Sequence, residues 1–142
     1  MSPITSALAR NALARSAPGL SAGEARLAAA FIDVRLDLSL DHSAILDLYL
    51  ARAYYGAGCY GVETASLALF AVPLAKADDA QLLALAALPV FPSRTLRDPE
   101  ARAARIDRIL GTLVAEERLT PAEAERLAAL APAEIAKGSF CE

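Results

Sequence analysis

Residues 45–63 read I-L-D-L-Y-L-A-R-A-Y-Y-G-A-G-C-Y-G-V-E, and this stretch decides the fold. A helix-forming apolar segment runs directly into three closely spaced glycines, Gly56, Gly58 and Gly61, and a second helix is expected from about Val62. Glycine tolerates the positive φ angles that end a helix and turn the chain sharply. The stretch therefore predicts a buried helix, a tight turn beneath an open surface and a return into the core.

The rest of the chain is also typical of helices. Alanine and leucine dominate, strand-like alternation is absent, and capping signals precede several apolar segments, so the predicted fold class is all-α. Pro89 and Pro92 should hold the chain extended between two of these helices. We expect helices over residues 3–15, 22–38, 42–55, 62 onward, 79–88, 99–117 and 121–132.

Composition excludes several classes of protein and site. The 142 residues carry a net charge of −3 at a pI of about 5.2, so the chain offers no basic surface to nucleic acid. Although 56% of the residues are hydrophobic, no apolar stretch reaches the roughly 18 residues that would predict a membrane span. With one histidine, and with Cys59 and Cys141 outside any metal-type spacing, we predict no metal and no cofactor.

The three glycines also spell G-x-G-x-x-G, the pattern of a dinucleotide-binding turn. That turn requires a preceding strand, because the pyrophosphate binds where a strand leads into a helix. Here a helix precedes the glycines. The favoured interpretation is therefore structural, with glycines that end one helix and begin the turn.

Several motifs occur in the order found in a known family. Residues 2–11 match a Ser-Thr-Ile-Thr-Gln-Gln-Leu motif at Ser2, Ile4, Thr5, Leu8, Arg10 and Asn11. Residues 45–63 match a later motif at Ile45, Tyr49, Leu50, Gly56, Gly58, Gly61 and Glu63, and a Leu-Pro and Pro-Ser segment follows at residues 88–94. Together these segments resemble the family 51 glycosyltransferases, which polymerise lipid-linked disaccharide into peptidoglycan strands.

The resemblance implies a compact, lysozyme-like helical domain of about six to seven helices over residues 1–132, lacking its first part, with a frayed tail at 133–142. Family catalysis uses two glutamates. The first lies upstream of the motif in which this chain begins. The second, in an Arg-Lys-x-x-Glu motif, falls on Ala29, while the lysine falls on Arg26. An alanine cannot transfer a proton, so we expect no catalytic residue and a domain that is not an enzyme.

The resemblance and the residue types also indicate where substrate would bind. Arginine grips phosphate through two hydrogen bonds, and tyrosine rings stack on sugars, although each of these residues has a simpler interpretation as a solvated or structural side chain. Tyr55 and Tyr60 are expected at the surface beside the glycines, and Arg94 in the extended Pro-Ser-Arg segment. The candidate substrate-binding residues are Ser2, Thr5, Arg10, Asn11, Arg26, Tyr55, Gly58, Tyr60 and Arg94.

Residues 27–34 are apolar nearly all round, and a domain without its first part would leave such helices uncovered. We therefore expect a homo-oligomer or a protein partner, and a lipid-linked precursor as a possible ligand. Because residues 1–10 do not resemble a signal peptide, the expected location is cytoplasmic. Three functions stay open: a non-catalytic relative that binds protein or precursor, a fragment of an active glycosyltransferase, and a helical interaction protein unrelated to the cell wall.

Overall fold

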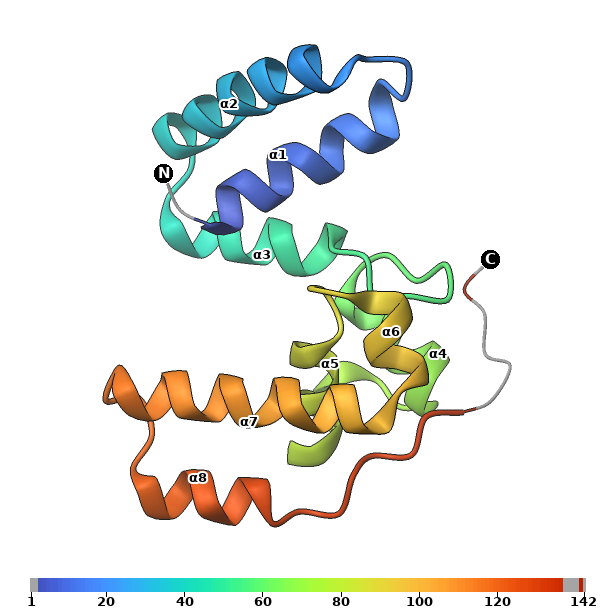
Figure 1. Ribbon diagram of the computed structural model, residues 1–142, viewed down its shortest axis with the longest axis vertical. Coiled ribbons are helices and arrows are strands. Elements are labelled where there is room, and N and C mark those ends of the chain that lie inside the picture. Colours follow the sequence, from blue (N-terminus) through green and yellow to red (C-terminus); the bar gives the residue numbers. More distant parts are fainter. Residues whose placement is uncertain (1–2, 137–140, 142) are drawn as a thin grey trace. The chain divides into compact units, whose positions relative to one another are not determined.

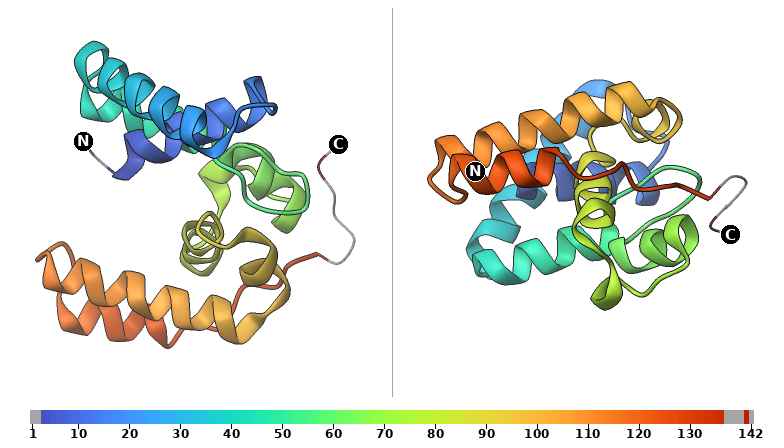
Figure 2. Two further views of the ribbon diagram at one scale, coloured as in Figure 1. Left: turned by 45° about the horizontal axis from the view of Figure 1, so that its top comes forward. Right: turned by 90° about the horizontal axis from the view of Figure 1, so that it is seen from below.

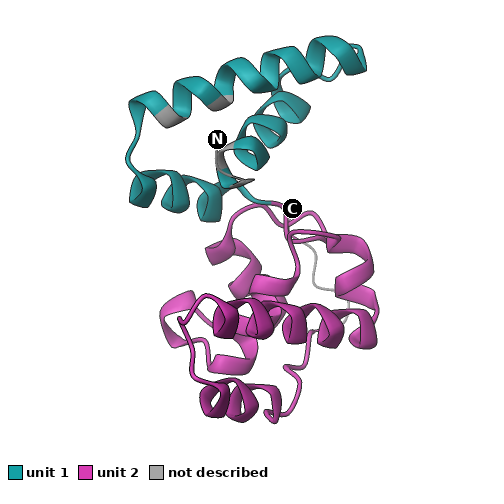
Figure 3. Cartoon of the chain, turned by 60° about the vertical axis from the view of Figure 1, so that its left-hand side comes forward, with its two compact units in different colours: residues 1–53 teal, residues 54–142 magenta. Residues whose placement is uncertain are grey.

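The chain is all-α throughout the part that its computed structural model describes, as the sequence predicts. That part comprises residues 3–136 and Cys141, without the side chains of Pro3, Thr5, Asp33 and Asp37. It divides into two compact units, residues 1–53 and 54–142 (Figure 3). One domain over residues 1–132 stays a prediction, because two compact units can belong to one domain. None of the helices described is both long and apolar enough to cross a membrane.

The first unit consists of three helices, α1 (Pro3–Ser16), α2 (Ala22–Ser39) and α3 (His42–Arg52). Helix α1 packs against both α2 and α3 and lies between them (Figure 1). The predicted capping box is present at the start of α2, where the hydroxyl of Ser21 accepts from the Glu24 N–H and the Glu24 carboxylate accepts from the Ser21 N–H. The caps explain why α2 and α3 begin where the sequence predicts.

Burial within this unit is uneven. Leu8 and Ala9 of α1 and Ile45 of α3 are buried. In contrast, α2 exposes large apolar side chains to solvent, with Leu27 at 76%, Phe31 at 68% and Leu38 at 82% of their surface. We call Leu27, Phe31, Val34 and Leu38 the apolar face of α2; Val34 is also exposed. The spacing of four, three and four residues places all four side chains along one side of the helix.

The described residues of the second unit form six helical elements: α4 (Val62–Phe70), the 3₁₀ turn η1 (Leu74–Lys76), α5 (Asp79–Ala87), α6 (Pro92–Arg97), α7 (Pro99–Ala115) and α8 (Pro121–Ala128). Helix α7 contacts α5, α6 and α8, and it runs side by side with α8 (Figure 2). Leu69, Leu85, Leu88 and Leu110 are almost fully buried and come from α4, the α5 end and α7. They form the apolar core of this unit.

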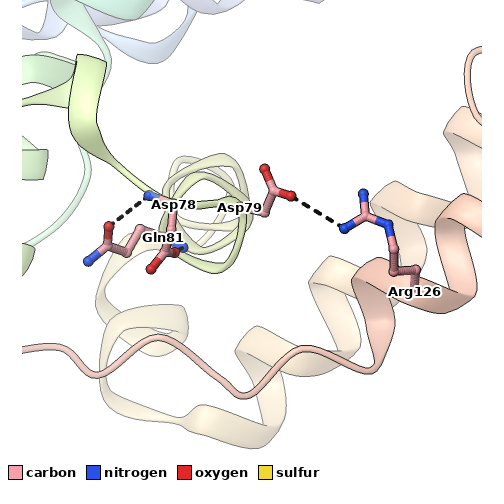
Figure 4. Close-up of polar contacts among 4 residues, drawn as sticks. All are labelled: Asp78, Asp79, Gln81 and Arg126. Carbon is pink, nitrogen blue, oxygen red and sulfur yellow. Dashed lines mark hydrogen bonds and ion pairs between the residues drawn. The ribbon is translucent and has the colours of Figure 1, made fainter.

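An exposed ion pair joins the start of α5 to α8. Asp78 caps α5 together with Gln81, and the neighbouring Asp79 carboxylate lies 3.6 Å from the Arg126 guanidinium (Figure 4). Both side chains are more than half exposed. Exposed pairs of this kind contribute little to stability, so the two helices are held mainly by their packing against α7.

Helix α6 was not expected, and the extended conformation predicted at Pro92 is wrong. Pro92 occupies the first helical position, where its missing N–H costs nothing and its fixed φ suits a helix. The C-terminal end of α6 is held by Arg102, which is 8% exposed and donates from Nη1 to the carbonyls of Thr95 (2.9 Å) and Leu96 (3.1 Å). Burial lowers the pKa of the Arg102 guanidinium, and the nearby Asp98 carboxylate opposes that shift. With this extra helix, the described residues contain eight α-helices rather than six to seven.

The capping boxes predict a pH dependence of helix stability. Hydrogen bonds from Ser21 lower the pKa of Glu24, and hydrogen bonds from Thr120 lower that of Glu123, both from an ordinary value of 4.5. A depressed folded-state pKa stabilises the helix above that ordinary value, and the contribution disappears as the pH falls through the lower folded-state value. Carboxylate ¹³C NMR titration should therefore show both groups titrating below pH 4.5, with helical ellipticity falling over the same range.

Glu123→Gln is the matched control, because glutamine keeps the acceptor of the box without a titrating proton. In this variant, the remaining loss of ellipticity should follow the titration of Glu24. Ordinary pKa values for both glutamates in the folded chain would contradict the expectation.

Candidate functional site

A groove of about 620 Å³ lies between α1 and α2 of the first unit. We call it the α1–α2 groove. Its charged residues are Arg10 from α1 and Arg26 from α2, and no carboxylate lines it among the residues that the structure describes. The remaining lining is small and mostly apolar: Ser6, Leu13, Ala14, Ala17, Pro18, Leu20, Ala25, Ala29 and Ala30.

Arg10 and Arg26 are both exposed, and neither guanidinium is ion-paired with a carboxylate whose side chain is described. Two unpaired guanidinium groups on facing helices offer donors for the oxygens of a phosphate or pyrophosphate. Small side chains around them leave room for such a group. The α1–α2 groove is therefore suited to hold an anion with an apolar portion.

Ala29 lies one helical turn beyond Arg26 on α2 and lines the same groove. This is the position on which the resemblance places the second glutamate. Glu24, five residues before Ala29 on this helix, is not part of the lining, and its carboxylate accepts hydrogen bonds from Ser21. The groove can therefore bind charge, but its described lining has no carboxyl group to move a proton.

Of the other candidates near the start of the chain, only Asn11 has a described side chain, and it does not line this groove. Asn11 lines a second groove of about 510 Å³, formed by all three helices together with Arg15 and Arg52. Thr5 belongs to α1, but its side chain is not described, and Ser2 lies outside the described residues. The sequence therefore predicts both arginines of the α1–α2 groove but not Ser6. Ser6 differs from the residue of the family motif at its position, and it carries no charge.

The glycines form a tight turn over residues 54–61 in the second unit, which we call the glycine turn. Gly56, Gly58 and Gly61 have φ angles of 90°, 79° and 89°, so the predicted left-handed backbone is confirmed. An isolated antiparallel bridge joins Tyr54 to Tyr60, and their ring centroids are 4.9 Å apart. A helix, not a strand, leads into the turn. A dinucleotide-binding turn needs a preceding strand, so the structural interpretation of the glycines is confirmed.

The two tyrosines chosen as surface candidates differ. Tyr60 is 43% exposed, whereas only 2% of Tyr55 is exposed, so the surface position expected for Tyr55 is wrong. The backbone N–H of Tyr55 donates to the carbonyl of Cys59 at 2.9 Å, which closes the turn. Helix α3 ends at Arg52, three residues earlier than expected, and this shift moves Tyr55 from a helix into the turn.

A disulfide between Cys59 and Cys141 joins the turn to the end of the chain, with the two Cα atoms 4.8 Å apart. The N–H of Cys141 donates to the carbonyl of Ala57 at 3.1 Å. Its own carbonyl oxygen would lie 2.6 Å from a Cβ added to Gly58, so only glycine fits there. Sequence reasoning missed this bond because the cysteines are 82 residues apart; their even number was the available signal.

The segment expected to fray, 133–142, is described only in part. Residues 137–140 and 142 lie outside the described residues. Before that gap, the N–H of Ala136 donates to the carbonyl of Leu69 at 3.0 Å, and after it Cys141 is bonded as above. Arg94, expected in an extended segment, instead lies exposed on α6. The structure thus brings Arg10 and Arg26 together in one groove, and Gly58 and Tyr60 together in one turn.

Comparison with known proteins identifies the family of the chain. The profile of the family described as Transglycosylase matches residues 1–114, which run from α1 to nearly the end of α7. The chain belongs to the transglycosylase family. Its membership confirms the resemblance to family 51 glycosyltransferases, and the all-α structure is consistent with a transglycosylase domain.

Two curated relatives of this transglycosylase-family chain are penicillin-binding proteins. Penicillin-binding protein 1A of Aquifex aeolicus (strain VF5) is 29% identical over 126 residues, which cover 87% of this chain and 17% of the relative. Penicillin-binding protein 2D of Bacillus subtilis (strain 168) is 39% identical over 64 residues, which cover 45% of this chain and 9% of the relative. The chain therefore spans less than a fifth of the length of either relative.

Proposed function

We propose that this transglycosylase-family chain binds the pyrophosphate-linked lipid precursor of peptidoglycan and does not polymerise it. One observation carries the proposal: Arg10 and Arg26 line a groove together with Ala29, the residue on which the resemblance places the second family glutamate. The two guanidinium groups supply phosphate-binding donors, while the carboxylate needed for turnover is replaced by a methyl group.

The chemistry supports binding without turnover. Glycosyl transfer needs a base to take the proton of the attacking sugar hydroxyl, and electrostatic stabilisation of the departing pyrophosphate. Arg10 and Arg26 can supply the electrostatic stabilisation, because positive charge near the pyrophosphate offsets the negative charge that develops there. Nothing in the described lining of the α1–α2 groove can act as the base. A ligand held by its pyrophosphate would therefore stay unreacted.

The apolar face of α2 supports a second part of the proposal, that a homo-oligomer or a protein partner covers this helix. Leu27, Phe31 and Leu38 are each more than two-thirds exposed, and a soluble protein rarely leaves such a row of side chains in water. Size-exclusion chromatography with light scattering tests it, and a chain that stays monomeric and binds no partner would oppose it.

The location also stays a proposal. The sequence predicts the cytoplasm, but the disulfide between Cys59 and Cys141 is of a kind that persists mainly in oxidising compartments. This bond therefore supports an extracytoplasmic location over a cytoplasmic one. Alkylation of free thiols in intact cells tests the location. If both cysteines are found reduced in the cell, an oxidising compartment is contradicted.

A single assay separates binding from turnover. Fluorescent lipid-linked disaccharide in detergent micelles is incubated with the purified chain, bound ligand is measured by anisotropy, and products are separated by gel electrophoresis. We expect saturable binding and no glycan strands. Strand formation would overturn the proposal and favour a fragment of an active glycosyltransferase, and absence of binding would favour a helical interaction protein.

A further inference from the structure

We propose that the Cys59–Cys141 disulfide is a thiol–disulfide exchange site through which a small dithiol controls the exposure of the glycine turn. The proposal is independent of the proposed function, because it concerns the second unit alone. It rests on three features: the unequal exposure of the two cysteines, the scarcity of other contacts at Cys141, and the close approach of Cys141 to Gly58.

The two cysteine residues differ in exposure. Cys59 has no exposed surface, whereas Cys141 is half-buried. Exchange requires a thiolate to reach one sulfur in line with the bond, so an incoming thiolate reaches the Sγ atom of Cys141 first. This direction of attack makes Cys59 the leaving group.

The exchange balances as a two-electron reduction. The first thiolate of the dithiol forms a mixed disulfide with Cys141, and Cys59 leaves as a thiolate that takes a proton. The second thiolate of the dithiol then attacks the other sulfur of the same dithiol, which is bonded to Cys141 in the mixed disulfide. This step releases Cys141 as a thiolate and leaves the dithiol as a cyclic disulfide. The protein gains two thiols and the dithiol is oxidised.

Few other contacts hold Cys141 on the turn. Among the backbone hydrogen bonds described, its N–H donates to the carbonyl of Ala57, and the next one along the tail is that of Ala136 to Leu69. Its Sγ atom also lies 4.0 Å from the carbonyl oxygen of Thr64. A single hydrogen bond at the surface competes with water and is weak by itself. Once the sulfur–sulfur bond is broken, only the contacts with Ala57 and Thr64 remain, among those described, to keep Cys141 beside the turn.

The position of Cys141 makes its release consequential. In the oxidised chain its carbonyl oxygen lies where a Cβ of residue 58 would be, so it covers the backbone of Gly58. Departure of Cys141 uncovers the peptide groups at Ala57 and Gly58, next to the exposed Tyr60 ring. Reduction thus converts a covered turn into an open one without a change in the helices.

Intrinsic fluorescence reports on this turn. The chain has four tyrosines and no tryptophan, and Tyr54, Tyr55 and Tyr60 belong to the glycine turn. The test measures acrylamide quenching of tyrosine emission in the whole chain before and after dithiothreitol, with maleimide labelling to count thiols. We expect two new thiols per chain, stronger quenching after reduction and unchanged helical ellipticity.

Cys141→Ser supplies the control, because its turn should be open without reductant. Its quenching should equal that of the reduced wild type and should not respond to dithiothreitol. The proposal is overturned if the disulfide of the native chain resists millimolar dithiothreitol until the chain unfolds. It is equally overturned if two thiols appear and the quenching of the wild type stays the same.

A pair of glycine variants adds a second measurement that does not depend on fluorescence. Gly58→Ala and Gly56→Ala both place alanine at a positive φ, but the new Cβ meets Cys141 only at residue 58; at residue 56 it meets Leu96 and Pro92. The reduction rate should therefore rise in Gly58→Ala and match the wild type in Gly56→Ala. Equal rates in all three folded chains would contradict the proposed contact.

Discussion

Replacing Tyr55 with alanine should cost about 3–5 kcal/mol of unfolding free energy, the largest loss expected from a single side chain here. Tyr55 is 2% exposed and is among the largest fully buried side chains of the protein. Its removal leaves a cavity beneath the glycine turn, where the backbone is held by the Tyr55 to Cys59 hydrogen bond and cannot collapse freely. Urea unfolding followed by circular dichroism measures the loss.

Tyr60→Ala is the matched control, since it removes the same atoms from the same turn. Tyr60 is 43% exposed, and its ring pairs with Tyr54 at 4.9 Å. We expect this variant to lose only about 0.5–1.5 kcal/mol, the usual value of an aromatic pair. Equal losses for the two variants, or a loss below about 1 kcal/mol for Tyr55→Ala, would show that Tyr55 does not support the core.

Reversing the charge of both groove arginines, Arg10→Glu with Arg26→Glu, should nearly abolish binding of the lipid-linked precursor. A hydrogen bond to a charged group contributes about 1.5–3 kcal/mol, so each lost guanidinium should weaken binding by roughly tenfold to a hundredfold. The new carboxylates also repel the pyrophosphate. Anisotropy titrations at low and high salt measure the effect, and the wild-type affinity should fall with salt because the contacts are exposed.

Arg35→Glu separates this local effect from a general change of charge. Arg35 lies on the same helix as Arg26 and is exposed, but it does not line the α1–α2 groove. Precursor affinity should change by less than about threefold in this variant, as expected for a distant surface charge under screening. If Arg35→Glu weakens binding as much as Arg26→Glu, attraction by overall charge would replace the groove as the explanation.

The helices were predictable because their start signals are local. Capping boxes at Ser21, Asp78 and Thr120 are complete in the structure, and each helix begins directly after its cap. Each of these signals involves four consecutive residues whose hydrogen bonds need no tertiary contact. The same locality explains the glycine turn, whose positive φ angles only glycine adopts readily.

Features that depend on distant residues were not predictable in this way. The end of α6 is held by Arg102 of the following helix. Its guanidinium is buried and donates hydrogen bonds to the carbonyls of Thr95 and Leu96. The disulfide requires residues 59 and 141 to meet in space. The contact of Arg102 and the pairing of the cysteines have no signal within a short window of sequence, so the extended conformation predicted at Pro92 is wrong and the disulfide is not predicted at all.

The candidate site shows the same division. Arg10 and Arg26 were selected one by one from motif positions, and sequence spacing alone could not show that they line one groove with Ala29. Tyr55 and Tyr60 looked equivalent as neighbours of glycine. In the structure α3 ends at Arg52, so both tyrosines lie in the turn, where Tyr55 is buried and Tyr60 is exposed.

The bond between Cys59 and Cys141 also has a mechanical consequence. It makes residues 59–141 a covalent ring, so a force applied to the two ends of the chain bypasses nearly all of the second unit. Such a force would stretch only the first 59 residues and Glu142, at most about 200 Å at roughly 3.4 Å per residue. The oxidised second unit would therefore survive traction that unravels the first, and reduction would remove that shielding.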